Sequence, residues 1–241
     1  ELPQMDQGVT VLHVWPEGAS LRRTPVHPAG RNVHQRTLYV QLNADASANL
    51  SVEETVQGVE AAGYRARYRA EGTRQERVER QLRDLFPGLE LATQRFGDLT
   101  DVEQAVRFNY TGRAPQFALR DGNQLRVMPS TIGSLSRALA RTQTRRHTLD
   151  LGSTTRYSER RVITLPAGAR ATTMPAAGEV RSAYGMARMR VTTAGSTITI
   201  DTEFELTRDR VPATEYEAFR AWMERADQLF EQRLLVEGGA P

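Results

Sequence analysis

Histidine is a natural first place to look for chemistry, because imidazole titrates near neutral pH and is the commonest metal ligand. The sequence contains four histidines, His13, His27, His34 and His147. His27 and His34 lie seven residues apart in TPVHPAGRNVHQR, a segment that has proline and arginine but no carboxylate between the two histidines. A metal site needs three or four converging ligands. We therefore predict solvated loop histidines and no metal site.

A hydrolytic triad could be assembled from Ser130, His147 and Asp150. A nucleophile elbow places its serine in the pattern G-x-S-x-G between a strand and a helix, and the segment MPSTIG around Ser130 lacks that pattern. Because triads are defined by geometry and not by chain order, a stand-alone hydrolase that uses Ser130 and His147 stays one of the hypotheses.

Paired carboxylates and phosphate-binding loops are two other sources of chemistry. Glu53 and Glu54 are neighbours, but adjacent strand residues point to opposite faces, so the two cannot act as one acid–base pair. A solvated strand edge is the expected environment. Gly58 and Gly63 do not have the spacing of a phosphate loop. We expect no catalytic residue, no cofactor-binding residue and no cofactor in this chain.

Aromatic side chains could bind a ligand by stacking. On a sheet face they would form a sugar-binding platform, although strand aromatics more often pack in the core or across strands. The alternative function for the chain is therefore a glycan- or cell-envelope-binding β-sandwich module that uses Tyr64, Tyr68, Phe108, Tyr110 and Phe117.

Composition sets the outer limits. The 241 residues suffice for two domains of about 100–150 residues each. With 39% hydrophobic and 25% charged residues, the chain has a globular profile rather than that of a disordered protein. It has no cysteine, which excludes a thiol nucleophile, disulfides and thiolate metal sites. The absence of cysteine fits an exported protein that avoids mispaired disulfides.

The charge pattern argues against nucleic acid as a partner. Every basic residue is arginine, and the net charge is only +3. A nucleic-acid-binding protein gathers its positive charge on one face, whereas here arginines alternate with acids, as in RAEGTRQERVERQLRD. We also expect no membrane span, because no apolar run approaches the roughly 18 residues that a spanning helix needs.

Hydrophobic periodicity predicts the elements of the first half. Alternation predicts strands over 35–42 and 49–56, and GYRARYR is expected to continue as an aromatic strand. The period then changes, because Val78, Leu82 and Leu85 fall on one helical stripe. We therefore predict a helix near 73–86, ended by the Pro-Gly pair that follows it.

The second half repeats this order of strands and helix. Strands are predicted over 157–165, 183–193, 196–206 and 233–236. A C-terminal helix is expected near 213–231, with Thr214 as N-cap and Glu217 completing a capping box. The predicted fold is mainly β with a few packed helices, in the α+β class. It has two β-sandwich-like antiparallel sheet domains, 1–150 and 151–241, each with a helix on or beside its sheet.

Several structural motifs mark the C-terminal half. A strand ends in Leu-Pro, a later strand begins with Ser-x-Tyr-Gly, and the last helix carries Pro-x-x-x-Tyr-x-x-Phe-Arg with an aspartate near its end. The residues concerned are Leu165, Pro166, Pro175, Ser182, Tyr184, Gly185, Pro212, Tyr216, Phe219, Arg220 and Asp227. With these motifs the segment resembles the closing module of bacterial transglutaminase-like proteins, in which β-rich domains of unknown function flank a papain-like core.

The first half carries markers of its own, namely Gly58, GYRARYR, LFPGLEL and FGDLTDVEQAVRFNYTGRAP. With them it is similar to the module that directly follows the core in that family. The resemblance implies a non-catalytic accessory module C-terminal to the core, in a protein exported to the periplasm or the outside of a bacterium. Its partner would be the core of the same polypeptide, and ELPQMDQGVTVLHV would be the seam between them. The family's catalytic Cys, His and Asp belong to the core and match no residue here.

Overall fold

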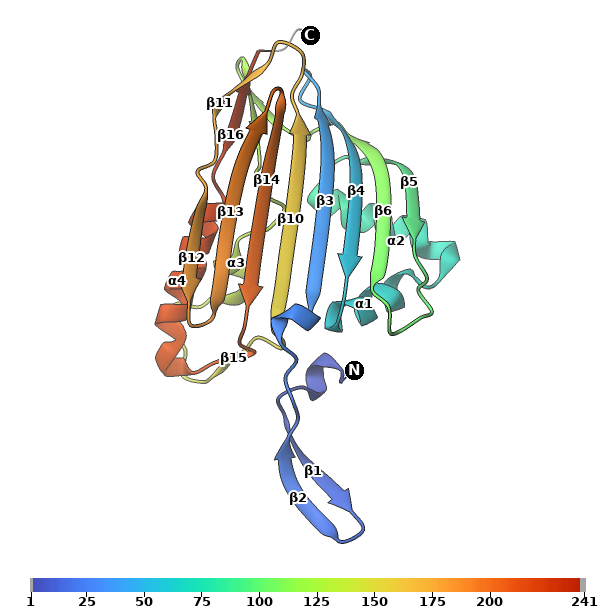
Figure 1. Cartoon of the computed structure of the whole chain (residues 1–241), viewed down its shortest axis with the longest axis vertical. Coiled ribbons are helices and arrows are strands. Elements are labelled where there is room, and N and C mark those ends of the chain that lie inside the picture. The colour runs from blue at the N-terminus through green and yellow to red at the C-terminus, as the bar shows by residue number, and fades with distance from the viewer. Residues whose placement is uncertain (1, 239–241) are drawn as a thin grey trace.

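One large sheet organises the chain, whose computed structural model describes residues 2–238 (Figure 1). Its eight strands lie in the order β12-β13-β14-β10-β3-β4-β6-β5. Their bounds, in that order, are Gly178–Ser182, Gly185–Ala194, Thr197–Leu206, Thr155–Thr164, Val33–Leu42, Ala48–Val56, Val106–Ala114 and Glu90–Phe96. Figure 1 shows every helix longer than one turn behind this sheet, so that the face toward the viewer is uncovered.

The two halves of the chain meet in the middle of the sheet. The blocks β12-β13-β14-β10 and β3-β4-β6-β5 are each antiparallel, as predicted, and the α+β class is confirmed. The blocks are joined edge to edge by β10 and β3, which run parallel. One sheet therefore crosses the expected boundary at residue 150, and the division into the units 1–150 and 151–241 stays a prediction.

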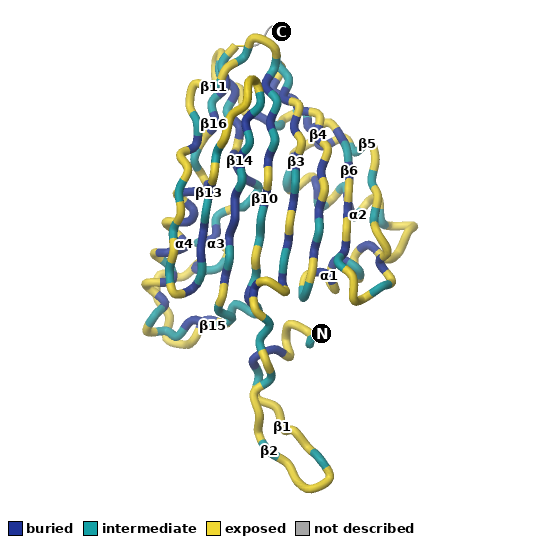
Figure 2. Tube along the Cα trace, viewed as in Figure 1, coloured by how far each residue is buried: buried dark blue, intermediate teal, exposed yellow. Residues whose placement is uncertain are grey.

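A second layer covers the inner face of the sheet. It contains the four helices α1 (Val59–Tyr68), α2 (Glu71–Leu85), α3 (Leu135–Leu139) and α4 (Tyr216–Phe230). It also contains a smaller sheet in the order β11-β16-β8-β7, with bounds Arg170–Thr173, Leu234–Glu237, Gln124–Val127 and Leu119–Asp121. In Figure 2 dark blue alternates with yellow and teal along the large strands, because one side of each strand faces this layer and the other faces solvent.

Short elements complete the chain. The 3₁₀ turns are η1 (Gln4–Asp6), η2 (Ala29–Arg31) and η3 (Ala213–Glu215). A small pair links β9 (Leu149–Asp150) to β15 (Arg210–Val211). A hairpin of β1 (Thr10–Trp15) and β2 (Gly18–Arg23) projects from one end of the body (Figure 1). Within residues 2–238, no helix combines the length and the apolar character that a membrane crossing requires.

The predicted aromatic strand at GYRARYR is wrong, because this segment forms α1. The helix starts after Gly58, whose φ of +73° is open to glycine but strained for other residues. A Cβ at that position would also collide with Asn32 and with the carbonyl of Arg31. Tyr64 and Tyr68 are four residues apart, a spacing that places two side chains on one face of a strand and equally on one face of a helix.

Helix α4 is present as predicted, but its start differs. A 3₁₀ turn precedes it, and its first turn has no side-chain cap, so the predicted capping box at Thr214 is wrong. What holds the helix is an aromatic cluster beneath β13 and β14. The ring centroids of Phe204 and Trp222 lie 5.8 Å apart, and those of Tyr184 and Phe219 lie 5.3 Å apart at nearly a right angle. Packing therefore replaces the capping interaction.

The first prediction concerns Phe219, whose side chain is fully buried in that cluster. Phe219→Ala would leave a cavity and should lower the free energy of unfolding by about 3–5 kcal/mol. Chemical denaturation of the chain measures this loss. Val102→Ala is the control, since Val102 is 74% exposed and its truncation should be nearly neutral. Equal stability of the two variants would show that α4 is only peripheral to the fold.

Candidate functional site

Five charged or ionisable side chains are buried where the two halves of the sheet meet. They are His34 and Arg36 on β3, Glu54 on β4, and Glu159 and Arg161 on β10, and we call them the buried ionic cluster. Arg36 lies opposite Glu54 in the β3–β4 register and opposite Glu159 in the β3–β10 register. Since residues in register point to the same face of a sheet, the sheet itself brings these charges together.

Arg36 is the centre of the cluster. Its Nε donates to Glu54 Oε1 at 3.0 Å, and its Nη1 lies 3.6 Å from Glu159 Oε2. Nη1 also donates to Thr131 Oγ1 at 2.7 Å and to the Tyr157 hydroxyl at 3.2 Å. Burial lowers the pKa of Arg36, but Glu54, Tyr157 and Glu159 together outweigh burial and raise that pKa well above its ordinary value. Arg36 is therefore permanently charged.

Glu159 is the most enclosed member of the cluster. Its Oε1 accepts from Arg161 Nε at 2.7 Å and from the backbone N–H of Thr131 at 2.9 Å. Its Oε2 accepts from the Tyr157 hydroxyl at 2.9 Å and also from the Thr131 hydroxyl. Burial raises the pKa of Glu159, but Arg161 and Arg36 reverse that effect and lower the pKa to about 2. The carboxylate stays ionised and is saturated with donors.

His34 joins the cluster to helix α1. Its Nε2 lies 3.1 Å from Glu54 Oε2, and its Nδ1 lies 3.3 Å from Glu60 Oε2 in the first turn of α1. A carboxylate can only accept, so both ring nitrogens must carry protons for both bonds to form. Burial lowers the pKa of His34, yet the hydrogen bonds to Glu54 and Glu60 outweigh it and the pKa is raised.

The members of this cluster are engaged with one another. Both carboxylates pair with the central guanidinium, and burial raises the pKa of Tyr157, so its hydroxyl stays protonated. A depression on the uncovered face passes over Arg36 and Glu159, but its side-chain walls come from the outward-facing neighbours Gln35, Thr37, Ser158 and Arg160. The side chains of the cluster itself point to the other face.

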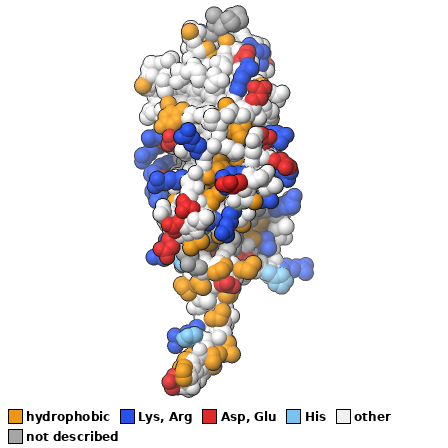
Figure 3. Space-filling view, turned by 90° about the vertical axis from the view of Figure 1, so that its right-hand side faces the viewer, with side chains coloured by type: hydrophobic (Ala, Val, Ile, Leu, Met, Phe, Trp, Pro, Cys, Tyr) orange, Lys and Arg blue, Asp and Glu red, His pale blue; other side chains and the backbone are white. Residues whose placement is uncertain are grey.

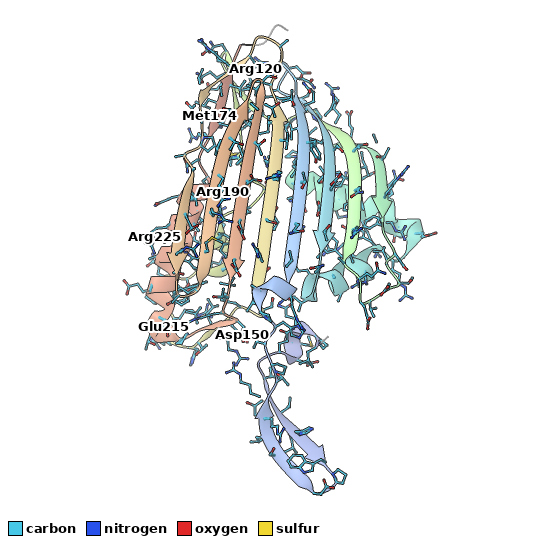
Figure 4. All side chains as sticks on the ribbon, viewed as in Figure 1. Arg120, Asp150, Met174, Arg190, Glu215 and Arg225 are labelled. Atoms are coloured by element: carbon cyan, nitrogen blue, oxygen red, sulfur yellow. The ribbon has the colours of Figure 1, made fainter. Side chains whose placement is uncertain are left out.

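The uncovered face carries charges of a different kind. Arg160 Nε donates to Asp201 Oδ1 at 2.6 Å, and Glu203 is shared by Arg156 at 2.5 Å and Arg188. Arg190 lies opposite Asp201 in the β13–β14 register, and Figure 4 shows it near the middle of this face. The Arg160–Asp201 pair is solvated and therefore weak, whereas Glu203 is buried between its two arginines.

The proposed triad residues do not meet. Ser130 is buried, accepts from the N–H of Ile132 at 3.0 Å and lies 3.5 Å from the Thr202 hydroxyl. His147 is exposed, and Asp150 pairs with Arg210 at 3.6 Å. Within residues 2–238 no hydrogen bond joins any two of the three, so they do not form a hydrogen-bonded triad.

The expected solvation of histidines and glutamates is correct only in part. His13 and His147 are exposed and His27 is half-buried, but His34 is buried on a strand rather than solvated in a loop. Glu53 and Glu54 do point to opposite faces, yet Glu54 is buried and not part of a solvated edge. Among the described residues no group of three or more His, Cys, Asp or Glu could hold a metal ion.

The predicted sugar-binding platform is wrong as a surface. Four of its five members are buried, and Phe117 is half-buried against Phe86, so no exposed row of rings results; the buried ones are Tyr64, Tyr68, Phe108 and Tyr110. Tyr68, Phe96 and Phe108 instead stack in the core under α1. These aromatic side chains therefore serve core packing.

Residue type alone did not identify the buried ionic cluster. The alternation of buried and exposed positions along the strands does indicate it. In β3 the even-numbered residues Leu38, Val40 and Leu42 form the apolar side, and His34 and Arg36 continue that phase. Glu54 similarly continues the phase of Leu50 and Val52 in β4. A charge in the core-facing phase of a strand requires a buried partner, and that rule would have pointed to these residues.

Comparison with known proteins places part of the chain. Residues 124–236 match the model of DUF3858, described as a domain of unknown function with a solved structure. The match starts at β8 and ends within β16, two strands that pair with each other in the small sheet. It covers slightly less than half of the chain, and we describe that segment as similar to this family. No curated protein matches the chain.

A solved structure also resembles part of the chain. It is a crystal structure from Parabacteroides distasonis ATCC 8503, provisionally described as a protease. The sequence identity is 16%, the TM-score is 0.40, and the match covers 49% of this chain and 24% of the other. The chain thus spans about a quarter of the length of that protein.

The second prediction tests the structural role of the cluster. Glu159→Gln removes the charge that two buried arginines share and should cost about 3–5 kcal/mol of folding free energy. Urea denaturation measures that loss. The control is Asp201→Asn, which removes the partner of exposed Arg160 and should change stability by about 1 kcal/mol or less. If the two variants were equally stable, the cluster would not be holding the sheet together.

The third prediction concerns pH. The folded-state pKa of His34 lies above its ordinary value of 6.5, so protonated His34 stabilises the fold fully below about pH 6.5. This contribution should be lost as the pH rises through the raised folded-state pKa. The groups facing His34 are Glu54, Glu60 and Arg36, and it also touches the rings of Tyr64 and Tyr157. Burial raises the pKa of Glu54, but Arg36 and His34 outweigh burial and lower that pKa, so this carboxylate is ionised across the range.

Denaturation of the chain between about pH 6 and pH 9 measures this loss. The control is His34→Gln, which can donate a hydrogen bond but cannot titrate, and which should flatten the decline in stability. A decline of the same size in wild type and His34→Gln would assign the pH dependence to other groups.

Proposed function

We propose that this chain is a non-catalytic accessory module that lies C-terminal to a transglutaminase-like core in a larger bacterial protein. In that role it supports the core or mediates interaction with a partner. The parent protein would be exported to the periplasm or to the outside of the cell. The DUF3858 match over 124–236 and the family motifs of both halves support this assignment.

One observation carries the proposal. The side chains best suited to acid–base chemistry, namely Glu54, Glu159 and His34, are used up in buried ion pairs with Arg36, Arg161 and Glu60. Their bonds connect β3, β4, β10 and α1. These side chains thus hold secondary-structure elements together instead of facing a substrate, and this is the role that a supporting module requires.

The uncovered sheet face favours a protein partner. Uncharged polar side chains such as Gln35, Thr37 and Ser51 face outward from its centre, beside the arginine–carboxylate pairs of β10, β13 and β14. Such a mixed polar surface is typical of domain–domain contacts within a chain. The burial of Tyr64 and Tyr68 removes the platform on which glycan binding was based. Nucleic acid is disfavoured because acids accompany the arginines on this face.

The fourth prediction tests the accessory role. The isolated chain should hydrolyse no peptide or amide substrate above the buffer rate. The core expressed with the chain should unfold at a higher temperature than the core alone. For domains of about 150–250 residues, a gain of 1 kcal/mol corresponds to roughly 2–4 °C.

Two calorimetric scans and an amidase assay make the test. Ser130→Ala is the control in the assay, because this change removes the nucleophile of the hypothetical triad. Activity in the isolated chain that disappears in Ser130→Ala would establish an enzyme instead. An unfolding temperature of the core that is the same with and without the chain would contradict the supporting role.

A further inference from the structure

Exposed apolar side chains concentrate on the β1–β2 hairpin. Nine large apolar residues are exposed in the described part of the chain, and four of them lie in this hairpin of 14 residues: Val11, Leu12, Val14 and Leu21. Leu12, Val14 and Leu21 are 62%, 67% and 72% exposed. Figure 3 shows hydrophobic side chains gathered along the hairpin, away from the charged body of the molecule. Clustering of this kind marks an interaction site.

The register separates two faces of the hairpin. Leu12 lies opposite Leu21 and Val14 opposite Ala19, so these four side chains form one apolar strip that we call the Leu12 face. On the other face the Arg22 guanidinium lies 5.6 Å from the centre of the Trp15 ring, and the His13 ring lies 5.2 Å from it. Trp15 is therefore covered within the hairpin, whereas the Leu12 face is bare.

The base of the hairpin is closed by hydrogen bonds between its own two ends, and one ion pair connects it to the body. The N–H of Val9 donates to Thr24 Oγ1 at 3.0 Å, the N–H of Thr24 donates to Val9 O at 2.9 Å, and Arg23 Nε donates to Gly8 O at 3.0 Å. Arg23 also lies 3.9 Å from Asp209. Beyond this base β1 pairs only with β2. A lone two-stranded hairpin is only marginally stable in water. A surface that covered the apolar strip would therefore stabilise the hairpin.

The size of the Leu12 face and the charge at the hairpin tip indicate what kind of partner can cover this face. Three of the six pairs in register lie on each side of the hairpin, so even the whole side that bears the Leu12 face has only six residues. A stable interface between free molecules uses about 20–30 residues on each side. The Leu12 face is thus too small to hold a second copy or a freely diffusing partner by itself. It suffices for a surface that a covalent link keeps at high effective concentration. Exposed Glu17 at the tip opposes insertion of the hairpin into lipid.

We propose that the Leu12 face packs against an apolar sheet surface of the domain to which this chain is joined in the same polypeptide. This inference rests on the proposed function, which supplies that domain. Packing of sheet on sheet at about 10 Å would cover Leu12, Val14 and Leu21 together. The hairpin then fixes the orientation of the body relative to its neighbour.

Hydrogen exchange provides the test. Amides of residues 10–23 should exchange about ten-fold or more slowly in the full-length polypeptide than in the 241-residue chain. The double variant Leu12→Asp with Leu21→Asp should abolish that protection. Because both side chains project into solvent, the unfolding temperature of the 241-residue variant should equal that of the parent chain.

The matched control replaces two exposed apolar residues outside the hairpin. Val102 and Leu119 are 74% and 54% exposed, and Val102→Asp with Leu119→Asp should leave the protection intact. Equal exchange of the hairpin in both polypeptides would overturn the inference. So would sedimentation of the 241-residue chain as a dimer that Leu12→Asp with Leu21→Asp dissociates, since the occupant would then be a second copy.

The two proposals fail differently. A core that loses thermal stability without the chain, combined with an unprotected hairpin, keeps the accessory role and overturns the hairpin contact. A protected hairpin on a core of unchanged stability keeps the contact and overturns the supporting role.

Discussion

The ion pairs of Arg36 with Glu54 and Glu159 are the interaction on which the rest of the structure depends. They lie beneath the only parallel strand pair among the described strands, where two antiparallel blocks become one sheet. Burying three charges is unfavourable unless each is paired and hydrogen-bonded. The structure meets that condition, because Thr131 and Tyr157 supply the remaining donors and acceptors. These contacts fix the register of the strands at the junction of β3 and β10.

Other elements are attached through the same cluster. His34 connects it to Glu60 on α1, and Arg161 Nη1 donates to the backbone carbonyl of Met128 at 2.6 Å, just after β8. A second carboxylate serves α3, since Asp227 near the end of α4 accepts from the N–H of Leu135 at 2.5 Å and from Ser134 Oγ at 2.8 Å. The short helix α3 is therefore held by a side chain from α4, so that polar contacts bind the second layer in both halves.

The sequence predicts what depends on local periodicity and misses what depends on distant partners. β3 and β4 could be predicted because a strict alternation fixes both strand and face. The segment that forms α1 could not, since the spacing of Tyr64 and Tyr68 fits a strand and a helix alike. The same limit applies to the site. Arg36 reads as a surface residue until Thr131, 95 residues away, and Tyr157, 121 residues away, are placed beside it.

The buried ionic cluster at the β3–β10 junction also explains why the inner and outer faces of the large sheet differ in their charge pairs. Slipping β10 by one residue against β3 would turn Glu159 and Arg161 toward solvent and leave Arg36 buried with less counter-charge. Such a slip is costly, and the register is therefore set from inside. The outer face of the sheet then contributes little to specifying the fold and can carry weak, solvated pairs such as Arg160 with Asp201. Residues 10–23 of the hairpin contain no such buried charge pairs, and its apolar Leu12 face is left exposed. Internal charge pairing thus fixes the body of the molecule and leaves the outer sheet face and the hairpin free for the contact proposed above.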